Sequence, residues 1–228
     1  MSTRTPSRTH PSPARRSTAP ADARVRRARA TVAKASRRRR RDLLVWGAVL
    51  TAVVALIAAM MWSARETTDT TARPAPDFTL TDTSGATVKL ADFRGRNVVL
   101  YFNEGAGCQS CILQMADIER MAAAFTAANI TVLPIVMNTA EQIKADMAAN
   151  GVTTPFLLDD GTVSAAYGTL GKGMHDGLPG HSFVLIDAQG TQRWYGEYPS
   201  MYLSSADLLD QVRKHLPYLA VRPTMKVH

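Results

Sequence analysis

The stretch YFNEGAGCQSC, Tyr101 to Cys111, contains both cysteines of this 228-residue chain, Cys108 and Cys111. An apolar run at 98–102 precedes the pair, and a run with apolar residues at helical spacing follows it. A cysteine at the start of a helix lies beside free backbone N–H groups, which stabilise its thiolate. A second cysteine one turn further on is placed to resolve a mixed disulfide. The pattern therefore predicts a redox pair in which Cys108 attacks and Cys111 resolves.

Charge divides the chain into two parts. Residues 1–41 hold 14 of the 27 Lys and Arg residues and one of the 19 acidic residues, which leaves 13 basic and 18 acidic residues elsewhere. Nucleic-acid recognition would need a basic folded surface, so we expect no nucleic-acid partner. Because residues 1–41 contain few large apolar side chains, we expect them to form a disordered cytoplasmic tail.

Residues 42–63 are predicted to form a transmembrane helix. Leu43 to Trp62 is a run of 20 residues without a charge, which is the length that crosses a bilayer. Five arginines, 37–41, precede it, and the positive-inside rule places them in the cytoplasm. A cleaved signal peptide is the alternative, although the basic region and the apolar run are both long for one. We expect a single-pass plasma membrane protein, with its N-terminus cytoplasmic and the rest of the chain extracytoplasmic.

The remaining residues predict one α/β domain at 77–219. A Thr- and Pro-rich tether at 64–76 precedes it and a C-terminal tail at 220–228 follows it. Strands that alternate with helices imply βαβ units, and a closing hairpin implies an antiparallel part of the sheet. The expected elements are a hairpin at 77–90, strands at 98–102, 130–137, 155–158, 181–186 and 191–196, and helices at 111–129, 139–150, 162–167 and from 204 onward.

Three segments, at 75–102, 108–111 and 180–194, together resemble the thioredoxin-fold redoxins. This group includes the AhpC/TSA (alkyl hydroperoxide reductase/thiol-specific antioxidant) family and TlpA-like membrane-tethered oxidoreductases. APDFTLTDTSGATVKLADFRGRNVVLYF (75–102) is similar to the opening of that family, and GHSFVLIDAQGTQRW (180–194) is similar to its closing hairpin. The third segment is the CQSC itself. The resemblance covers about 75–219 and implies a thioredoxin-like fold with an N-terminal β-hairpin extension.

The chain departs from the pattern of these families at three positions. Gly107 stands where thioredoxins usually carry a Trp before the first cysteine. Gly105 stands where the peroxiredoxin signature PxxxTxxC has its Thr. His181 occupies the position of the thioredoxin cis-proline, where peroxiredoxins often carry Arg. The resemblance implies that His181 lies beside the cysteines, where an imidazolium would stabilise a thiolate.

Two further residues surround the predicted site. Glu104 is either a surface acid or a proton carrier for Cys111. His175, in a Gly-rich loop at 168–180, is expected to be solvated. The expected catalytic residues are therefore Cys108, Cys111, His181 and Glu104, with no cofactor and no bound metal.

These residues favour a membrane-anchored extracytoplasmic thiol–disulfide oxidoreductase. Its partners would be protein thiols and disulfides outside the cytoplasm, an integral membrane thiol reductant or oxidant, and the lipid bilayer. One alternative is a peroxiredoxin-like peroxidase, in which Cys108 forms a sulfenic acid that condenses with Cys111. The other is a copper-binding assembly factor, because two thiolates and an imidazole suit Cu(I).

Overall fold

The computed structural model describes residues 19–63 and 65–216. Residues 1–18 of the predicted tail and the predicted C-terminal tail at 220–228 lie outside the described residues. The chain divides into two compact units, Met1–Met61 and Trp62–His228.

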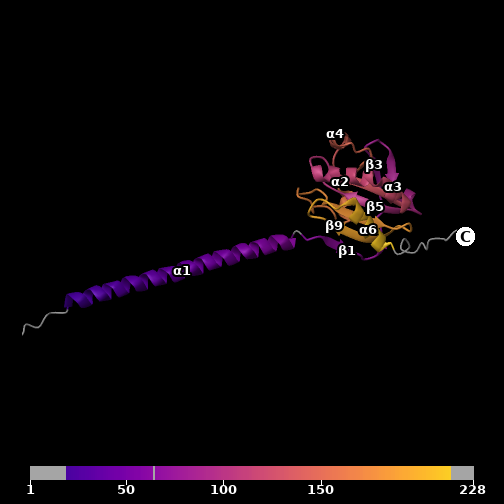
Figure 1. Cartoon of the computed structure of the whole chain (residues 1–228). Helices are drawn as coiled ribbons and strands as arrows, with labels where there is room; N and C mark the ends of the chain where they lie inside the picture. The colour runs from indigo at the N-terminus through magenta and orange to yellow at the C-terminus, as the bar shows by residue number, and fades with distance from the viewer. Residues whose placement is uncertain (1–18, 64, 217–228) are drawn as a thin grey trace, which may run out of the picture. The chain divides into compact units, whose positions relative to one another are not determined.

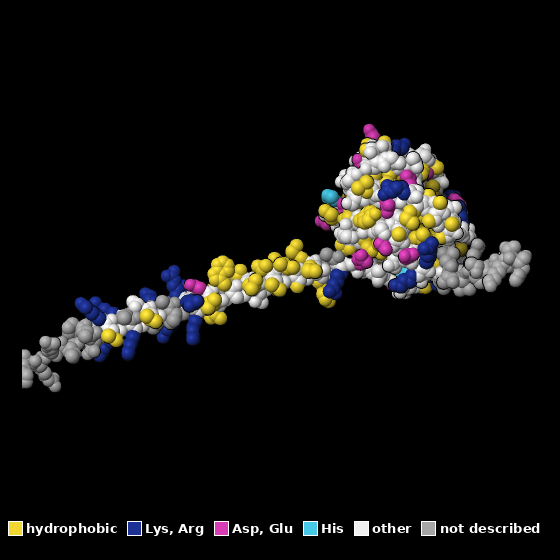
Figure 2. Space-filling view, in the orientation of Figure 1, with side chains coloured by type: hydrophobic (Ala, Val, Ile, Leu, Met, Phe, Trp, Pro, Cys, Tyr) yellow, Lys and Arg dark blue, Asp and Glu magenta, His cyan; other side chains and the backbone are white. Residues whose placement is uncertain are grey.

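The first unit contains one long helix, α1 (Ala19–Ser63). Lys and Arg side chains cluster along its N-terminal half, and apolar side chains cover the rest (Figure 2). Among the described residues it is the one helix long and apolar enough to cross a membrane, over Ala23–Trp62. Residues 19–41 are helical, so our expectation of disorder was wrong there. Ala and Arg dominate this stretch and have high helix propensity, and they extend a helix that the apolar segment already nucleates.

The second unit is built on one mixed β-sheet with the strand order β1-β9-β8-β5-β6-β7-β3-β4, and β2 also pairs with β9. The strands β1, β3, β5 and β9 are labelled in Figure 1. The central strand β5 runs parallel to β6 and antiparallel to β8. The strands are β1 (Thr67–Asp69), β2 (Arg73–Pro74), β3 (Thr79–Asp82), β4 (Thr87–Lys89), β5 (Asn97–Phe102), β6 (Ile130–Val136), β7 (Leu157–Leu158), β8 (Ser182–Ile186) and β9 (Thr191–Glu197).

Helices cover both faces of this sheet. Alternate residues of β5 face opposite sides, so Val99 and Tyr101 pack in one apolar cluster while Leu100 and Phe102 pack in another. Buried residues of α2, α3, α4 and α6 belong to the first cluster, and Val163 of α5 belongs to the second. The helices are η1 (Leu90–Phe93), α2 (Gln109–Arg120), α3 (Ala122–Ala127), α4 (Ala140–Asn150), α5 (Thr162–Ala166) and α6 (Ser205–His215).

The structure confirms the predicted order of strands and helices. The N-terminal hairpin is β3–β4, and its turn is fixed by Asp82, whose carboxylate accepts from the N–H groups of Ser84 and Ala86. The helix α4 begins with a capping box, in which Thr139 and Gln142 bond reciprocally. Both sets of hydrogen bonds join residues within four positions of each other in the sequence.

Two predictions about the elements were wrong. The expected tether at 64–76 contains β1 and β2, which pair with β9. They satisfy backbone groups that would otherwise be unpaired at that edge of the sheet. The helix expected over 111–129 begins at Gln109 and is interrupted at Met121, whose ψ of 14° turns the chain between α2 and α3. The change of direction buries Phe125 in the core.

Candidate active site

The site lies where β5 ends and α2 begins, and three side-chain oxygens shape the connecting loop. Asn103 Oδ1 accepts from the N–H of Gly105 at 3.0 Å, Asn138 Oδ1 from Ala106 at 2.8 Å, and Asp146 Oδ2 from Gly107 at 2.9 Å. These hydrogen bonds satisfy the backbone N–H groups of the loop, and those to Asn138 and Asp146 hold it against the end of β6 and against α4.

The geometry of this loop favours a glycine at position 105. Its φ is +74°, and a Cβ atom there would lie 1.8 Å from Asn138 Oδ1. A threonine at this position would therefore displace the Asn138 side chain and break the hydrogen bond that the Ala106 N–H donates to Asn138 Oδ1. Both the positive φ and this clash favour glycine over a peroxiredoxin-like threonine.

Cys108 and Cys111 form a disulfide at the N-terminus of α2. Cys108 is the N-cap residue and is partly exposed, whereas Cys111 lies inside the first turn with 0% of its surface exposed. Gly107 is exposed, and a Cβ atom there would meet nothing within 4 Å, so the surface beside Cys108 is open. One sulfur is thus open to an incoming thiolate and the other is shielded.

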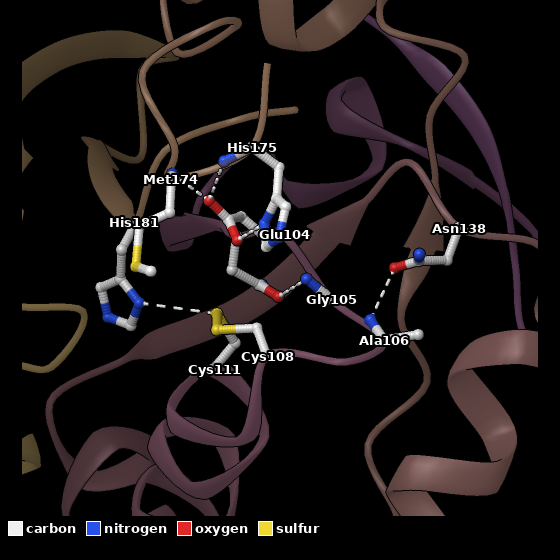
Figure 3. Close-up of polar contacts among 10 residues, drawn as sticks. Glu104, Gly105, Ala106, Cys108, Cys111, Asn138, Met174, His175 and His181 are labelled. Atoms are coloured by element: carbon white, nitrogen blue, oxygen red, sulfur yellow. Dashed lines mark hydrogen bonds and ion pairs between the residues drawn. A yellow bond between two sulfur atoms is a disulfide. The ribbon is translucent and has the colours of Figure 1, made fainter. Parts of the chain in front are cut away.

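His181 lies beside Cys111, as the resemblance implied. Its Nδ1 is 4.0 Å from Cys111 Sγ and 3.2 Å from the hydroxyl of Tyr101 (Figure 3 shows the contact with sulfur). The strand β8, which begins at Ser182 opposite Phe102 of β5, brings His181 to this place.

Burial sets the charge of His181 in the disulfide form. The side chain is 1% exposed and packs edge-on against the rings of Tyr101 and Phe183. Burial lowers the pKa of His181 to about 3, because an imidazolium would lose its hydration. At neutral pH and with the disulfide closed, this imidazole is neutral. The stabilisation of a thiolate by an imidazolium at His181 concerns the reduced form and stays a prediction.

Tyr101 is a site residue that our sequence reasoning missed. Its hydroxyl donates to the carbonyl oxygen of Cys111 at 3.1 Å and also contacts His181. Burial raises the pKa of Tyr101 above its usual value, so the hydroxyl keeps its proton. A signal was present in the sequence, since a tyrosine within a buried apolar strand needs a partner for its hydroxyl.

Glu104 holds a neighbouring loop in place. Its carboxylate, 2% exposed, accepts from the backbone N–H groups of Met174 and His175 and from His175 Nδ1 at 2.7 Å (Figure 3). Gly173 permits this close approach, because a Cβ atom there would lie 2.3 Å from Glu104 Oε1. No hydrogen bond joins Glu104 to Cys111 among the described residues, and its role as a proton carrier stays a prediction.

The environment of His175 is only partly as expected. Its side chain is 69% exposed, yet it is bonded to Glu104 instead of being fully solvated. Within the part of the chain that the structure describes, no three His, Cys, Asp or Glu side chains are grouped to hold a metal ion. Copper binding, one of the two alternative functions, stays a prediction.

Comparison with known proteins places this geometry in a family. The model of the AhpC/TSA family matches residues 71–195. Curated candidate peroxiredoxins from two strains of Mycobacterium tuberculosis are 38% identical over 99 residues, which cover 43% of this chain and 63% of theirs. The match thus spans less than two thirds of the length of these relatives.

Solved structures show the same fold. AhpC of Enterococcus faecalis is 16% identical with a TM-score of 0.58, and the match covers 68% of this chain and 99% of that one. A candidate protein disulfide isomerase from Bacteroides thetaiotaomicron is 28% identical with a TM-score of 0.50, and the match covers 64% and 89%. The thioredoxin-like fold expected from the sequence is confirmed.

Proposed function

The chain belongs to the AhpC/TSA family, and from this membership we propose that it is a thiol–disulfide oxidoreductase acting through Cys108 and Cys111. The observation that carries the proposal is the asymmetry of the disulfide. Cys108 is partly exposed at the N-terminus of α2, and Cys111 is fully buried beneath it. Exchange through a CxxC pair needs one sulfur that an incoming thiolate can attack and a second, shielded sulfur that resolves the mixed disulfide.

The reducing direction illustrates the chemistry. The Cys108 thiolate, stabilised by the free N–H groups of α2, attacks a substrate disulfide, and one substrate sulfur leaves as a thiolate. The Cys111 thiolate then attacks Cys108 Sγ, which closes the disulfide and releases the second substrate sulfur. An external thiol reductant returns two electrons by attacking Cys108. The oxidising direction follows the same steps in reverse.

Trapping of partners tests the proposal. Cys111→Ser keeps the attacking sulfur and loses the resolving one, so it should accumulate mixed disulfides with partner proteins. Cys108→Ser should accumulate none, because its remaining sulfur is buried. Non-reducing electrophoresis of cells expressing each variant measures this, and reductant added before loading should abolish the bands. Trapping by Cys108→Ser instead would reverse the assignment.

A hydroperoxide reductase is the second candidate, and the curated peroxiredoxin-like relatives favour it. Here the Cys108 thiolate attacks a peroxide oxygen, the O–O bond breaks and an alcohol or water leaves. The resulting sulfenic acid condenses with the Cys111 thiol, which forms the same disulfide and releases water. Rapid peroxide consumption with a thiol donor, in a protein for which neither cysteine variant traps partners, would select this function.

We also propose an extracytoplasmic place for the site. The apolar part of α1 supports a single membrane anchor, and the arginines before it support a cytoplasmic N-terminus. The partners would then be protein thiols and disulfides outside the cytoplasm. Cytoplasmic reductants do not reach that side, so an integral membrane thiol carrier would exchange electrons with Cys108.

A further inference from the structure

We infer that Tyr101 and His181 form a hydrogen-bond relay that receives the Cys111 sulfur as a thiolate when the disulfide opens. His181 would be a catalytic residue, since it contacts the reacting sulfur, and Tyr101 a positioning residue that fixes the tautomer of His181. The inference rests on the proposed thiol–disulfide exchange and extends it from Cys108, where attack occurs, to the leaving sulfur.

The tautomer of His181 follows from the single proton of the Tyr101 hydroxyl. That proton is directed to the carbonyl oxygen of Cys111, 3.1 Å away. The 3.2 Å contact between the hydroxyl oxygen and His181 Nδ1 is then a hydrogen bond only if Nδ1 carries a proton and donates it. The neutral ring therefore holds its proton on Nδ1, the nitrogen that faces Cys111.

The other ring nitrogen leads to the same assignment. His181 Nε2 is buried and has no hydrogen-bond partner among the described residues. A buried N–H without an acceptor is costly and rare, and an unpaired acceptor is more readily tolerated. A ring with an unprotonated Nε2 and a protonated Nδ1 therefore agrees with the contact to Tyr101 and avoids a buried N–H without an acceptor.

Opening of the disulfide places a negative charge on a buried sulfur, which this tautomer can stabilise. When a thiolate attacks Cys108 Sγ, a new S–S bond forms, the Cys108–Cys111 bond breaks, and the electron pair stays on Cys111 Sγ. This sulfur has 0% exposure, so bulk water does not solvate the new charge. The single Nδ1–H of His181 is bonded to the Tyr101 oxygen at 3.2 Å in the closed form and lies 4.0 Å from Sγ. When Sγ becomes a thiolate, this N–H shifts its hydrogen bond from the neutral hydroxyl oxygen to the charged sulfur.

The relay also explains why a neutral histidine is suitable here. An imidazolium would be costly to bury between Tyr101 and Phe183 before the charge on sulfur exists. A neutral N–H donor carries no such cost in the closed form and gains a charged acceptor only when the sulfur leaves. The Glu104 carboxylate, the nearby acid, is already bonded to the loop at 173–175.

The test is a titration of Cys111 in the full-length Cys108→Ser protein in detergent. Only one cysteine then remains, and its ¹³Cβ chemical shift reports the thiolate as pH rises. Replacing His181 by Ala should move the titration midpoint up by about one to two pH units, the size of a hydrogen bond to a charged group. His181→Asn retains an N–H donor and should move it less.

The variant Tyr101→Phe tests whether Tyr101 fixes the tautomer of His181. In the disulfide form, long-range ¹H–¹⁵N spectra should show His181 protonated on Nδ1 in the wild-type protein and on Nε2 to a larger extent in Tyr101→Phe. Tyr167→Phe and His215→Ala are matched controls outside the site, and both should leave the Cys111 midpoint unchanged.

Three results would overturn the relay: an Nε2–H tautomer in the wild-type protein, an imidazolium at pH 7 in the disulfide form, or an unchanged midpoint in His181→Ala. Should His181→Ala not fold, the tautomer of His181 in the wild-type protein and in Tyr101→Phe still decides the question. Loss of partner trapping with an intact relay would instead contradict the proposed function.

Discussion

The charge state of His181 is set by its surroundings and not by its residue type. An imidazole in water titrates near pH 6.5, but burial against two aromatic rings lowers the pKa of His181 to about 3. The native protein therefore binds fewer protons at this residue than the unfolded chain does in the interval between these values. Stability must fall as pH drops through that interval.

Comparison of stability at pH 7 and pH 5 checks this expectation. The contribution of neutral His181 to the free energy of unfolding is fully present above about pH 6.5 and is lost progressively as the pH falls toward about 3. The loss at pH 5 is about 2 kcal/mol. Wild-type protein should therefore lose about that much more unfolding free energy than His181→Asn over this step. Denaturant unfolding followed by circular dichroism measures the difference.

The choice of pH 5 separates His181 from the carboxylates. Hydrogen bonds lower the pKa values of Asp82, Asp117 and Glu119 despite their partial burial, so their stabilising effect disappears only in more acidic solution. Equal losses in wild type and His181→Asn would show that the histidine is charged, or hydrated, in the native state.

Two short strands complete the edge of the sheet at the element scale. Thr67–Asp69 and Arg73–Pro74 pair with β9, and Arg73 Nε donates to Gln192 Oε1 at 3.2 Å. The carbonyl oxygen of Pro76 accepts from the hydroxyl of Tyr167 at 2.6 Å. The segment between the helix α1 and the hairpin β3–β4 is thus part of the folded unit.

Truncation before and after these strands tests their role. A fragment that starts at residue 64 should be soluble and folded, because it keeps both strands. A fragment that starts at residue 77 lacks the Pro76 carbonyl oxygen, so the hydroxyl of the buried Tyr167 loses its acceptor. This loss by itself should lower the free energy of unfolding by about 1–3 kcal/mol. Thermal melts by circular dichroism compare the two. Equal melting temperatures would restore the tether interpretation.

At the scale of the whole molecule, the two units have opposite chemical character. Residues 1–41 hold 14 basic residues and one acidic residue, whereas the sequence after them is acidic on balance. The apolar part of α1 separates the basic residues from the redox site along the chain. If α1 spans a membrane as proposed, its two ends lie in different compartments.

Labelling of intact cells tests this topology. After mild reduction, a membrane-impermeant thiol reagent should modify Cys108 in whole cells, because it is the partly exposed cysteine. Cys108→Ser should remain nearly unlabelled and serves as the control. Labelling that appears only after lysis would place the site in the cytoplasm.

Local sequence patterns predicted most of the strands and helices and the position of the reactive pair. The alternation around Ser84 and Gly85, the capping box at Thr139 and the strand-to-helix junction before Cys108 each depend on residues within a few positions of one another. Such local signals need no tertiary context, because short-range hydrogen bonds and apolar periodicity generate them. The charge-free run in α1 is a local signal of the same kind.

The arrangement of the site depends on contacts between residues that are far apart in the sequence. Tyr101 and His181 are 80 residues apart, and Glu104 and His175 are 71 apart, yet both pairs are in contact. The first contact depends on the pairing of β8 with β5, and the second on a loop whose Gly173 leaves room for a carboxylate. The charge of His181 then follows from burial, which is a property of the packed fold. Sequence spacing does not determine such long-range register or the solvation of a single ring, so these features emerge only when the chain is folded.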